Sequence, residues 1–341
     1  MSGRHLPRRA TPLRPTATKA ACALLLAALL SLPFAEPSGA QAPSEFYKGK
    51  TVTLLGGGMV AQHLVTSLGQ YIPGAPRVEL KTQNGWNAGE LFFNGARDGS
   101  QFGFVSGREV IYQLLNIPVK YDVLKFGWIG TAQARTTVCV SSDTSPVKTL
   151  RDALGKELLM ATHETHSDET IVLRAANVMV GTKFKIVTGI PFPHDAVRDG
   201  LVAGRCSLWE GFRPLGKLGE KFNVLFQIGG RPHPELPNVP FLQDFAKAQV
   251  DKDALQMLAL PLILSDAYAV PPGVPAERLQ ALRTAFQRTL QDRQFLAAFN
   301  KQHSSFWDVQ HIGGDEIQNI LEAIYSMPEE SIARFRKLYM L

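Results

Sequence analysis

Short apolar or β-branched runs alternate with helix patterns along most of the chain after residue 42. The strands predicted in its first part cover 51–55, 77–82, 101–105 and a long extended stretch at 126–141. Gly56 to Gly58 and Pro73-Gly74 bracket the first helix, and a second helix is expected over 87–96. Such alternation predicts a parallel or mixed sheet with helices on both of its faces.

A second series of the same kind begins after Ser145-Pro146. Its predicted helices are 149–154, 168–180 and 194–203, and its predicted strands are 157–161, 184–187, 205–209 and 223–227. Gly204 is expected to end the helix at 194–203, because glycine favours the position after a helix. Beyond a strand at 267–270, helix patterns begin at Pro275, Asp315 and Pro328.

The N-terminus has the pattern of a secretory signal peptide. A basic stretch ending at Lys19 runs into an apolar segment that ends at Leu32, and small residues follow at Gly39, Ala40 and Ala42. We expect cleavage after Ala40 or after Ala42. The apolar segment is shorter than the roughly 20 residues that span a membrane, and a retained interfacial anchor is the alternative. The mature protein is therefore expected in the periplasm.

Export changes the charge balance. The formal net charge of +6 includes five basic residues and one acidic residue before residue 43, which leaves 31 of the 36 basic and 29 of the 30 acidic residues. A mature chain with a net charge of +2 gives no reason to expect nucleic acid as a partner.

Export also changes the interpretation of the cysteines. Removal of Cys22 leaves Cys139 and Cys206, an even pair in an oxidising compartment. We expect a disulfide between them, with two buried free thiols as the alternative.

Candidate binding residues lie where predicted strands give way to helices. These polar junctions hold Gly57, Gly58, Asn84, Gly89, Ser106, Thr162, Ser167, Asp168, Gly189 and Asp195. Ligands of open α/β sheets bind outside the carboxyl ends of strands, and helix N-termini favour anions. One shared cleft is therefore expected, although tight turns and helix capping would explain several of these residues equally well.

His163, Glu164 and His166 form the one cluster with metal-binding side chains that the sequence suggests. Two histidines three residues apart supply no third ligand by their spacing, so solvated histidines are the simpler interpretation. A secreted metal-dependent hydrolase that uses these three residues remains the enzyme alternative.

Five segments together resemble the substrate-binding proteins of tripartite tricarboxylate transporters, the Bug- or TctC-type receptors. They are Phe46-Tyr-Lys-Gly-Lys-Thr-Val52, Ala96-Arg-Asp-Gly-Ser100, Ser145-Pro-Val-Lys-Thr-Leu150, Gly181 to Gly189, and Ala269-Val-Pro-Pro-Gly-Val-Pro275. The order and spacing of these segments carry the resemblance, which extends over about residues 45–340.

The resemblance implies an α/β fold of the type II periplasmic-binding-protein kind, with a ligand cleft between two domains. Domain one would comprise 43–141 plus 265–341, and domain two 142–264. It also implies a monomeric receptor that captures a small organic acid for membrane permease subunits, without cofactor, metal or catalysis. A sensory or ligandless partner protein on the same fold is the alternative.

The chain departs from the family where glycines normally approach a carboxylate. The first glycine loop, at Gly56 to Ala61, is shorter, while Glu90 and Glu164 stand among or beside positions that are usually glycine. Because a like charge disfavours a polyanion, we expect the ligand to be a monocarboxylate or an amide rather than citrate.

Overall fold

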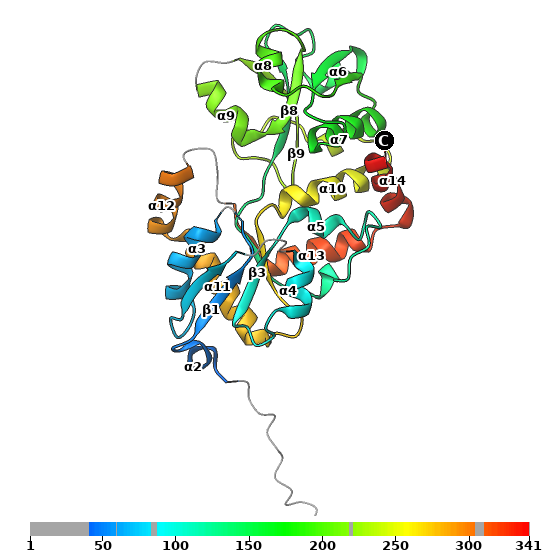
Figure 1. The fold of residues 1–341 in the computed structure, drawn as a ribbon. Coiled ribbons are helices and arrows are strands. Elements are labelled where there is room, and N and C mark those ends of the chain that lie inside the picture. Colours follow the sequence, from blue (N-terminus) through cyan, green and yellow to red (C-terminus); the bar gives the residue numbers. More distant parts are fainter. Residues whose placement is uncertain (1–40, 59, 83–86, 218–220, 304–309, 341) are drawn as a thin grey trace, which may run out of the picture. The chain divides into compact units, whose positions relative to one another are not determined.

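The computed structural model describes residues 41–58, 60–82, 87–217, 221–303 and 310–340 (Figure 1). The predicted signal peptide and Asn84 lie outside these ranges. No helix among the described residues is long and apolar enough to cross a membrane.

The first sheet has six strands in the order β11-β4-β10-β3-β1-β2. They are β1 (Thr51–Leu55), β2 (Arg77–Lys81), β3 (Gln101–Val105), β4 (Gly127–Thr131), β10 (Ala267–Val270) and β11 (Ile312–Gly313). β1 is parallel to β2 and β3, whereas β10 is antiparallel to β3 and β4. The carboxyl ends of β1 and β3 and the start of β10 therefore meet at one edge of the sheet.

The second sheet has five strands in the order β7-β6-β8-β5-β9. They are β5 (Thr137–Ser142), β6 (Leu158–Ala161), β7 (Phe184–Val187), β8 (Gly204–Leu208) and β9 (Phe222–Ile228). β6 is parallel to β7 and β8, and β5 is antiparallel to β8 and β9. Both sheets are thus mixed, as the alternation of strands and helices predicts.

Helices flank both sheets, and Figure 1 shows α3, α4 and α11 beside strands of the first sheet and α6 to α9 beside those of the second. The α-helices are α2 (Pro43–Tyr47), α3 (Ala61–Ser67), α4 (Ala88–Asn94), α5 (Gly107–Ile111), α6 (Leu150–Gly155), α7 (Asp168–Ala175), α8 (Pro193–Arg198), α9 (Trp209–Lys217), α10 (Gln249–Ile263), α11 (Ala276–Gln291), α12 (Arg293–His303), α13 (Gly314–Tyr325) and α14 (Glu329–Met340). A π-helical turn, Ala176–Val180, continues α7.

Helix α10 lies in the largest apolar core, where Leu255, Met257 and Leu260 are almost completely buried. The C-terminal helix α14 is fastened to it by two polar contacts. The Ser331 hydroxyl donates to Asp253 at 2.7 Å, and Arg334 pairs with Asp251 at 2.7 Å. α14 also packs against α7, so it joins elements that both belong to the predicted domain two.

The chain passes between the sheets at 132–136 and again at 262–266. These two passages lie side by side, because the amide of Ala132 donates to Asp266 O and the amide of Arg135 donates to Leu262 O, each at 2.9 Å. β5 already pairs in the second sheet from Thr137 onward, a few residues before the predicted boundary at Ser141. The division of the chain into 43–141 plus 265–341 and 142–264 stays a prediction.

The Cys139–Cys206 disulfide is present, which confirms the pairing expected from export. The two residues are directly opposite each other on the antiparallel strands β5 and β8, and both are buried. The bond joins neighbouring strands of one sheet.

Three local expectations are wrong. Helix α8 ends at Arg198, Gly200 takes the left-handed conformation with φ 73°, and Gly204 instead begins β8. Residue 209 begins α9 rather than ending a strand, because the chain turns directly from β8 into a helix. The extended stretch predicted at 126–141 is in fact two strands, β4 and β5, in different sheets.

Candidate functional site

A cavity of about 340 Å³, here called the inter-sheet cleft, is lined from elements of both sheets. Its lining residues are Ser106, Gly107, Arg108, Arg135, Thr137, Asp168, Glu169, Ser207, Leu208, Pro261, Leu262 and Ser265. The lining thus includes four residues with hydroxyl groups, two arginines and two acidic residues. Pockets that combine a few convergent polar groups in this way are the usual sites of small ligands.

Arg108 and Asp168 meet across this cleft. Nη2 of Arg108 lies 3.0 Å from both carboxylate oxygens of Asp168. Arg108 belongs to α5, directly after β3 of the first sheet, and Asp168 begins α7, after β6 of the second. The carboxylate raises the pKa of Arg108, so the guanidinium stays charged and ready to bind a carboxylate.

Arg135 supplies the second guanidinium from the passage between β4 and β5. Its Nη2 donates to Oε1 of Gln133 at 3.1 Å. Burial lowers the pKa of Arg135, and the negative charges of Glu210 and Asp266 partly oppose that effect. Glu210 and Asp266 are both buried, so the positive charge of Arg135 is matched mainly from within the protein.

A capping box holds Ser106 at the N-terminus of α5. Its side chain accepts from the amide of Arg108 at 3.3 Å, while Glu109 accepts from the amide of Ser106 at 2.9 Å. Burial raises the pKa of Glu109, although the amides of Ala88 and Ser106 donate to its carboxylate and oppose the shift. The cap fixes the direction in which α5 leaves β3 and so positions Arg108.

The predicted residues of the second sheet form a hydroxyl network beside Asp168. Thr162 is fully buried at the end of β6 and accepts from the hydroxyl of Thr170 at 2.7 Å. Ser167 is the N-cap of α7 and accepts from the amide of Thr170 at 3.4 Å. These contacts orient the start of α7, so Thr162 and Ser167 position Asp168 rather than line the cleft.

Gly58 packs against the protein's own buried groups. It has φ 102°, and a Cβ placed on it would lie 2.5 Å from both Oδ1 of Asp266 and the hydroxyl of Tyr268. Oδ2 of Asp266 also accepts from the amide of Val60 at 3.3 Å. Burial and the charge of Asp266 raise the pKa of Tyr268 far above its usual value. A carboxylate of the chain itself therefore lies against the short glycine loop.

The remaining predicted residues lie apart from the inter-sheet cleft. A Cβ on Gly57 would meet no atom within 4 Å, and Gly89 lines a separate cavity with Glu90 and Tyr121. Gly189 is a left-handed turn residue with φ 79°. Asp195 pairs with Arg198 at 2.8 Å within α8. Of the nine predicted residues that the structure describes, the cleft brings together Ser106 and Asp168.

The histidine cluster is exposed on the loop before α7. His163 Nδ1 lies 3.8 Å from Glu169, and His166 lines another hollow beside Asp168. Among the described residues, no group of three or more His, Cys, Asp or Glu side chains is arranged to hold a metal ion. The arrangement therefore supplies no third ligand for the hydrolase alternative.

No motif in the sequence marks Arg108, Arg135, Ser207 or Ser265 as a candidate binding residue. Arg108 stands two residues after the predicted Ser106, at the same junction of strand and helix, and this proximity was the available signal. Arg135 and Ser265 lie on the passages between the sheets, and nothing in their local pattern marks them as neighbours of a cleft.

No protein-family model and no curated protein matches the chain by sequence. Solved structures do match its fold. A TctC solute-binding protein from Polaromonas, without ligand, shares 14% identity, with a TM-score of 0.63 over 86% of this chain and 98% of that one. A periplasmic transporter shares 14% identity, with a TM-score of 0.51 over 85% and 98% of the two chains. The periplasmic binding protein BugD shares 13%, with a TM-score of 0.50 over 86% and 98%.

These likenesses establish the class of fold. The chain has the two-domain α/β fold of type II periplasmic binding proteins, which confirms the predicted fold class. In particular, its fold is that of the TctC- and Bug-type solute-binding proteins that its sequence segments resemble.

Proposed function

We propose that this protein is a periplasmic receptor that captures a small organic carboxylate in the inter-sheet cleft. The fold of TctC- and Bug-type binding proteins supports this role, because structurally similar proteins are solute-binding proteins. The proposal includes export by the signal peptide at residues 1–40 and delivery of the ligand to permease subunits of a tripartite tricarboxylate-type transporter.

The observation that carries the proposal is the contact between Arg108 and Asp168. Nη2 of Arg108 holds both oxygens of a carboxylate at 3.0 Å, and both residues line a cavity of about 340 Å³. A ligand carboxylate that replaces Asp168 would meet the same donor, with the hydroxyls of Ser106 and Ser207 close by. Charge-assisted hydrogen bonds of this kind are stronger than neutral ones.

The charges of the cleft favour a ligand with one carboxylate. Asp168 pairs with Arg108, Glu210 and Asp266 oppose the charge of Arg135, and Glu169 adds a further acid to the lining, so a second or third ligand carboxylate would face like charge. We infer a monocarboxylate or an amide-bearing acid, as expected from Glu90 and Glu164. Closure would follow from the ligand's greater affinity for the closed arrangement.

Native mass spectrometry of the periplasmically expressed protein, followed by calorimetry with the ligand it carries, tests this function. A carboxylate that binds with one-to-one stoichiometry and is lost from Arg108→Gln supports the receptor. A ligand that binds unchanged to Arg108→Gln contradicts the cleft. A protein that carries no small molecule and binds none from a carboxylate panel would instead favour the sensory or ligandless alternative.

A further inference from the structure

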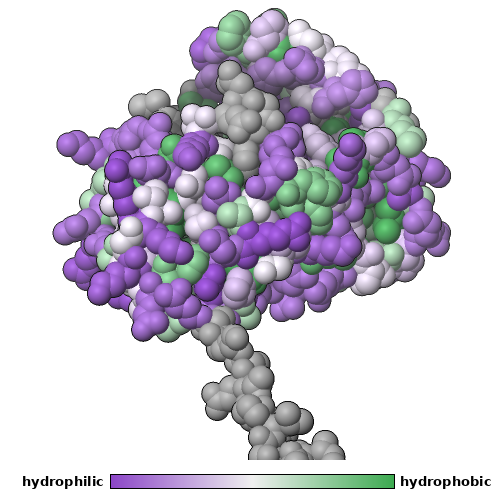
Figure 2. All heavy atoms as spheres, turned by 60° about the horizontal axis from the view of Figure 1, so that its bottom comes forward, coloured by the Kyte–Doolittle hydropathy of each residue, from purple (hydrophilic) through white to green (hydrophobic). Residues whose placement is uncertain are grey.

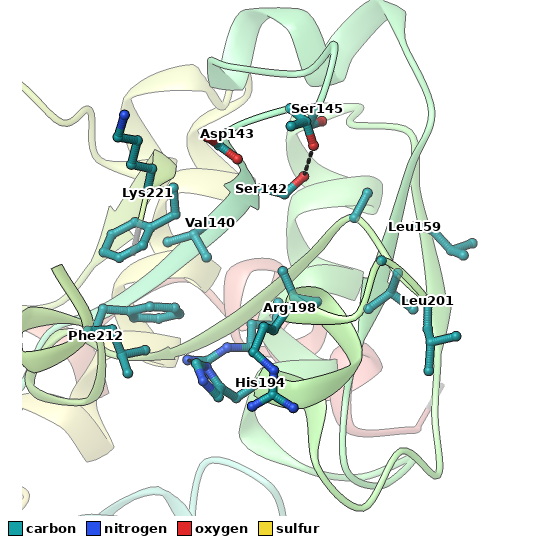
Figure 3. A pocket seen from close by; sticks show the side chains of 18 of the residues that line it. Val140, Ser142, Asp143, Ser145, Leu159, His194, Arg198, Leu201, Phe212 and Lys221 are labelled. Carbon is teal, nitrogen blue, oxygen red and sulfur yellow. Dashed lines mark hydrogen bonds between the residues drawn. The ribbon is translucent and has the colours of Figure 1, made fainter. Parts of the chain in front are cut away.

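Two hollows of the structure differ in how they relate to the inter-sheet cleft. The larger, of about 610 Å³, is lined by residues of α8 and α9 and, among the described residues, shares none of its lining with the cleft (Figure 3). The smaller, of about 250 Å³, shares Arg108, Asp168 and Pro261 with it. We call this smaller hollow the side pocket. The cleft and the side pocket therefore meet at the ion pair of Arg108 with Asp168.

The side pocket is mainly apolar, whereas the cleft is mainly polar. Its apolar lining comprises four aliphatic side chains and two tyrosine rings, namely Ile111, Leu115, Ile117, Ile171, Tyr112 and Tyr339. Ile111 and Ile171 are each 3% exposed and belong to the largest apolar core. Leu115 and Tyr339 pack against that core. The side pocket thus reaches the edge of the core directly beside a charged pair.

Exposure alone does not mark a binding surface. On the face of the molecule shown in Figure 2, hydrophobic residues lie in small groups among hydrophilic ones, and single exposed apolar residues are normal in soluble proteins. Ile117 is 43% exposed, but it lines the same hollow as three other aliphatic side chains and the Arg108–Asp168 pair. Apolar walls with a few polar groups at one end are typical of small-ligand sites.

The walls of the side pocket come from elements that follow different sheets. Ile111 belongs to α5, after β3 of the first sheet, and Ile171 belongs to α7, after β6 of the second. Helix α14 contributes Tyr339 and is joined to the segment after α5, because Nε of Arg336 donates to Leu114 O at 2.6 Å. An apolar group held against Ile111 and Ile171 together would favour the arrangement in which α5 and α7 approach each other.

The close approach of α5 to α10 fixes the place of Arg108. A Cβ on Gly107 would lie 2.6 Å from Pro261 O and 2.8 Å from Pro261 Cα, closer than real Cβ atoms come. The two backbones therefore pack in this way only because residue 107 is glycine. The backbone of Arg108, the next residue, is held beside α10, where the cleft and the side pocket meet.

Two tyrosines lie within reach of the charge of Arg108. The pKa of Arg108 is raised mainly by Asp168 and further by Tyr339 and Tyr112. Burial raises the pKa of Tyr339, the charge of Asp168 adds to the shift, and that of Arg108 opposes it. Tyr339 therefore stays protonated, and its hydroxyl can donate to an anion. The polar end of the side pocket thus offers a guanidinium and a phenol, and its other walls are aliphatic.

We propose that the ligand is a monocarboxylate with an apolar tail, which the side pocket holds. This inference rests on the function proposed for the inter-sheet cleft, in which the ligand carboxylate replaces Asp168 at Arg108. The tail then lies against Ile111, Leu115 and Ile171. An amide tail would place hydrogen-bonding groups against these aliphatic side chains, which costs free energy. The side pocket therefore decides between the two ligand classes that the charges of the cleft leave open.

Calorimetry with two acids of the same length and shape tests the proposal. In 5-methylhexanoate and in glutaramate three methylenes follow the carboxylate, and the tail ends in an isopropyl group in the first acid and in a primary amide in the second. We expect the Kd of 5-methylhexanoate to be about tenfold lower. From propanoate to hexanoate the Kd should fall about three- to fourfold for each added methylene.

A pair of variants tests where the tail lies. Ile117→Asn, at an exposed position, should raise the Kd of 5-methylhexanoate about three- to tenfold and leave that of propanoate nearly unchanged. Val178→Asn is the matched control, because Val178 is another aliphatic residue with a similar exposure of 45%, and it should change neither Kd. Thermal unfolding shows that each variant is folded, and the ligand series itself needs no variant.

The outcomes separate this inference from the proposed function. Glutaramate that binds as tightly as 5-methylhexanoate, or a Kd that does not depend on chain length, would overturn the side pocket. The receptor would still stand in that case if both acids are lost from Arg108→Gln. If neither acid binds, or if both bind unchanged to Arg108→Gln, the cleft fails and the inference fails with it. A preference for 5-methylhexanoate that Ile117→Asn reduces and Val178→Asn retains supports the side pocket.

Discussion

Nη2 of Arg108 and the two carboxylate oxygens of Asp168 are 3.0 Å apart, although the residues are 60 positions apart and follow strands of different sheets. Both side chains are largely exposed, at 62% and 68%. Exposed ion pairs contribute less than about 1 kcal/mol to stability. The pair bridges the cleft, and a ligand that displaces Asp168 from Arg108 therefore loses little free energy by breaking it.

Replacing Asp168 should strengthen ligand binding. In Asp168→Asn the ligand carboxylate no longer competes with an internal carboxylate for Arg108, and a like charge is removed from the cleft. We expect the Kd of a bound monocarboxylate to fall by about three- to tenfold, measured by calorimetry, in line with about 1 kcal/mol. Glu79→Gln, which removes an acid from an ion pair elsewhere, is the control. A weaker affinity in Asp168→Asn would mean that Asp168 itself contacts the ligand.

The charge of the cleft predicts which ligands raise the melting temperature most. A small monocarboxylate should raise the melting temperature more than citrate does, because Asp168 and Glu169 oppose extra negative charge. At about 100 times its Kd the bound ligand adds roughly 2.7 kcal/mol of stability. Thermal shift assays at matched ionic strength make the comparison. Citrate outperforming every monocarboxylate would contradict this prediction.

Alanine substitutions at Gly57 and Gly58, in the first loop, should have very different effects on the free energy of unfolding. Gly58→Ala places a Cβ 2.5 Å from Asp266 Oδ1 and the Tyr268 hydroxyl, at φ 102°. We expect it to lower the free energy of unfolding by about 1–3 kcal/mol. Gly57→Ala is the matched control, because its Cβ would meet no atom within 4 Å, and it should change stability by less than about 0.5 kcal/mol. Urea denaturation measures both, and equal effects would show that the contact with Asp266 is unimportant.

Loss of the disulfide should lower stability without changing the cleft. The double variant Cys139→Ala/Cys206→Ala opens a link between residues 67 positions apart. The chain-entropy model assigns about 4 kcal/mol to a loop of that length. Reductant should destabilise the native protein by a similar amount in urea denaturation and leave the double variant unaffected. Two thiols that react with an alkylating agent in the unreduced, denatured protein would contradict the bond.

Strands that are bounded by turn-forming or polar residues were predictable from the sequence. The bounds predicted for β1, β3, β7 and β10 agree with those observed, since each is a short apolar run next to turn-forming or polar residues. Helix α10 has no comparable signal. Its residues from Ala254 to Leu260 are mostly buried and apolar all round, and Pro261 lies inside it. A helix that is buried on several sides loses the amphipathic period by which helices are recognised.

The candidate site was less predictable, because its partners are distant in the sequence. Ser106 and Ser167 carry a local signal as helix N-caps. Asp266, which lies against the glycine loop, accepts a hydrogen bond from the amide of Val60, 206 positions away in the sequence. The pairing of Arg108 with Asp168 depends on how the two sheets face each other. Local patterns specify which residues begin a helix, but they do not specify what lies opposite.

The paired passages between the sheets have a mechanical consequence. Ala132 donates to Asp266, Arg135 donates to Leu262, and the hydroxyl of Ser265 donates to Gln133 O at 2.8 Å. Two segments joined in this way bend together as a ribbon, and they resist shear and torsion more than two separate linkers would. We expect them to favour bending about an axis across the ribbon over twisting. We therefore expect the closure proposed for the cleft to bring the two sheets to the same mutual orientation each time.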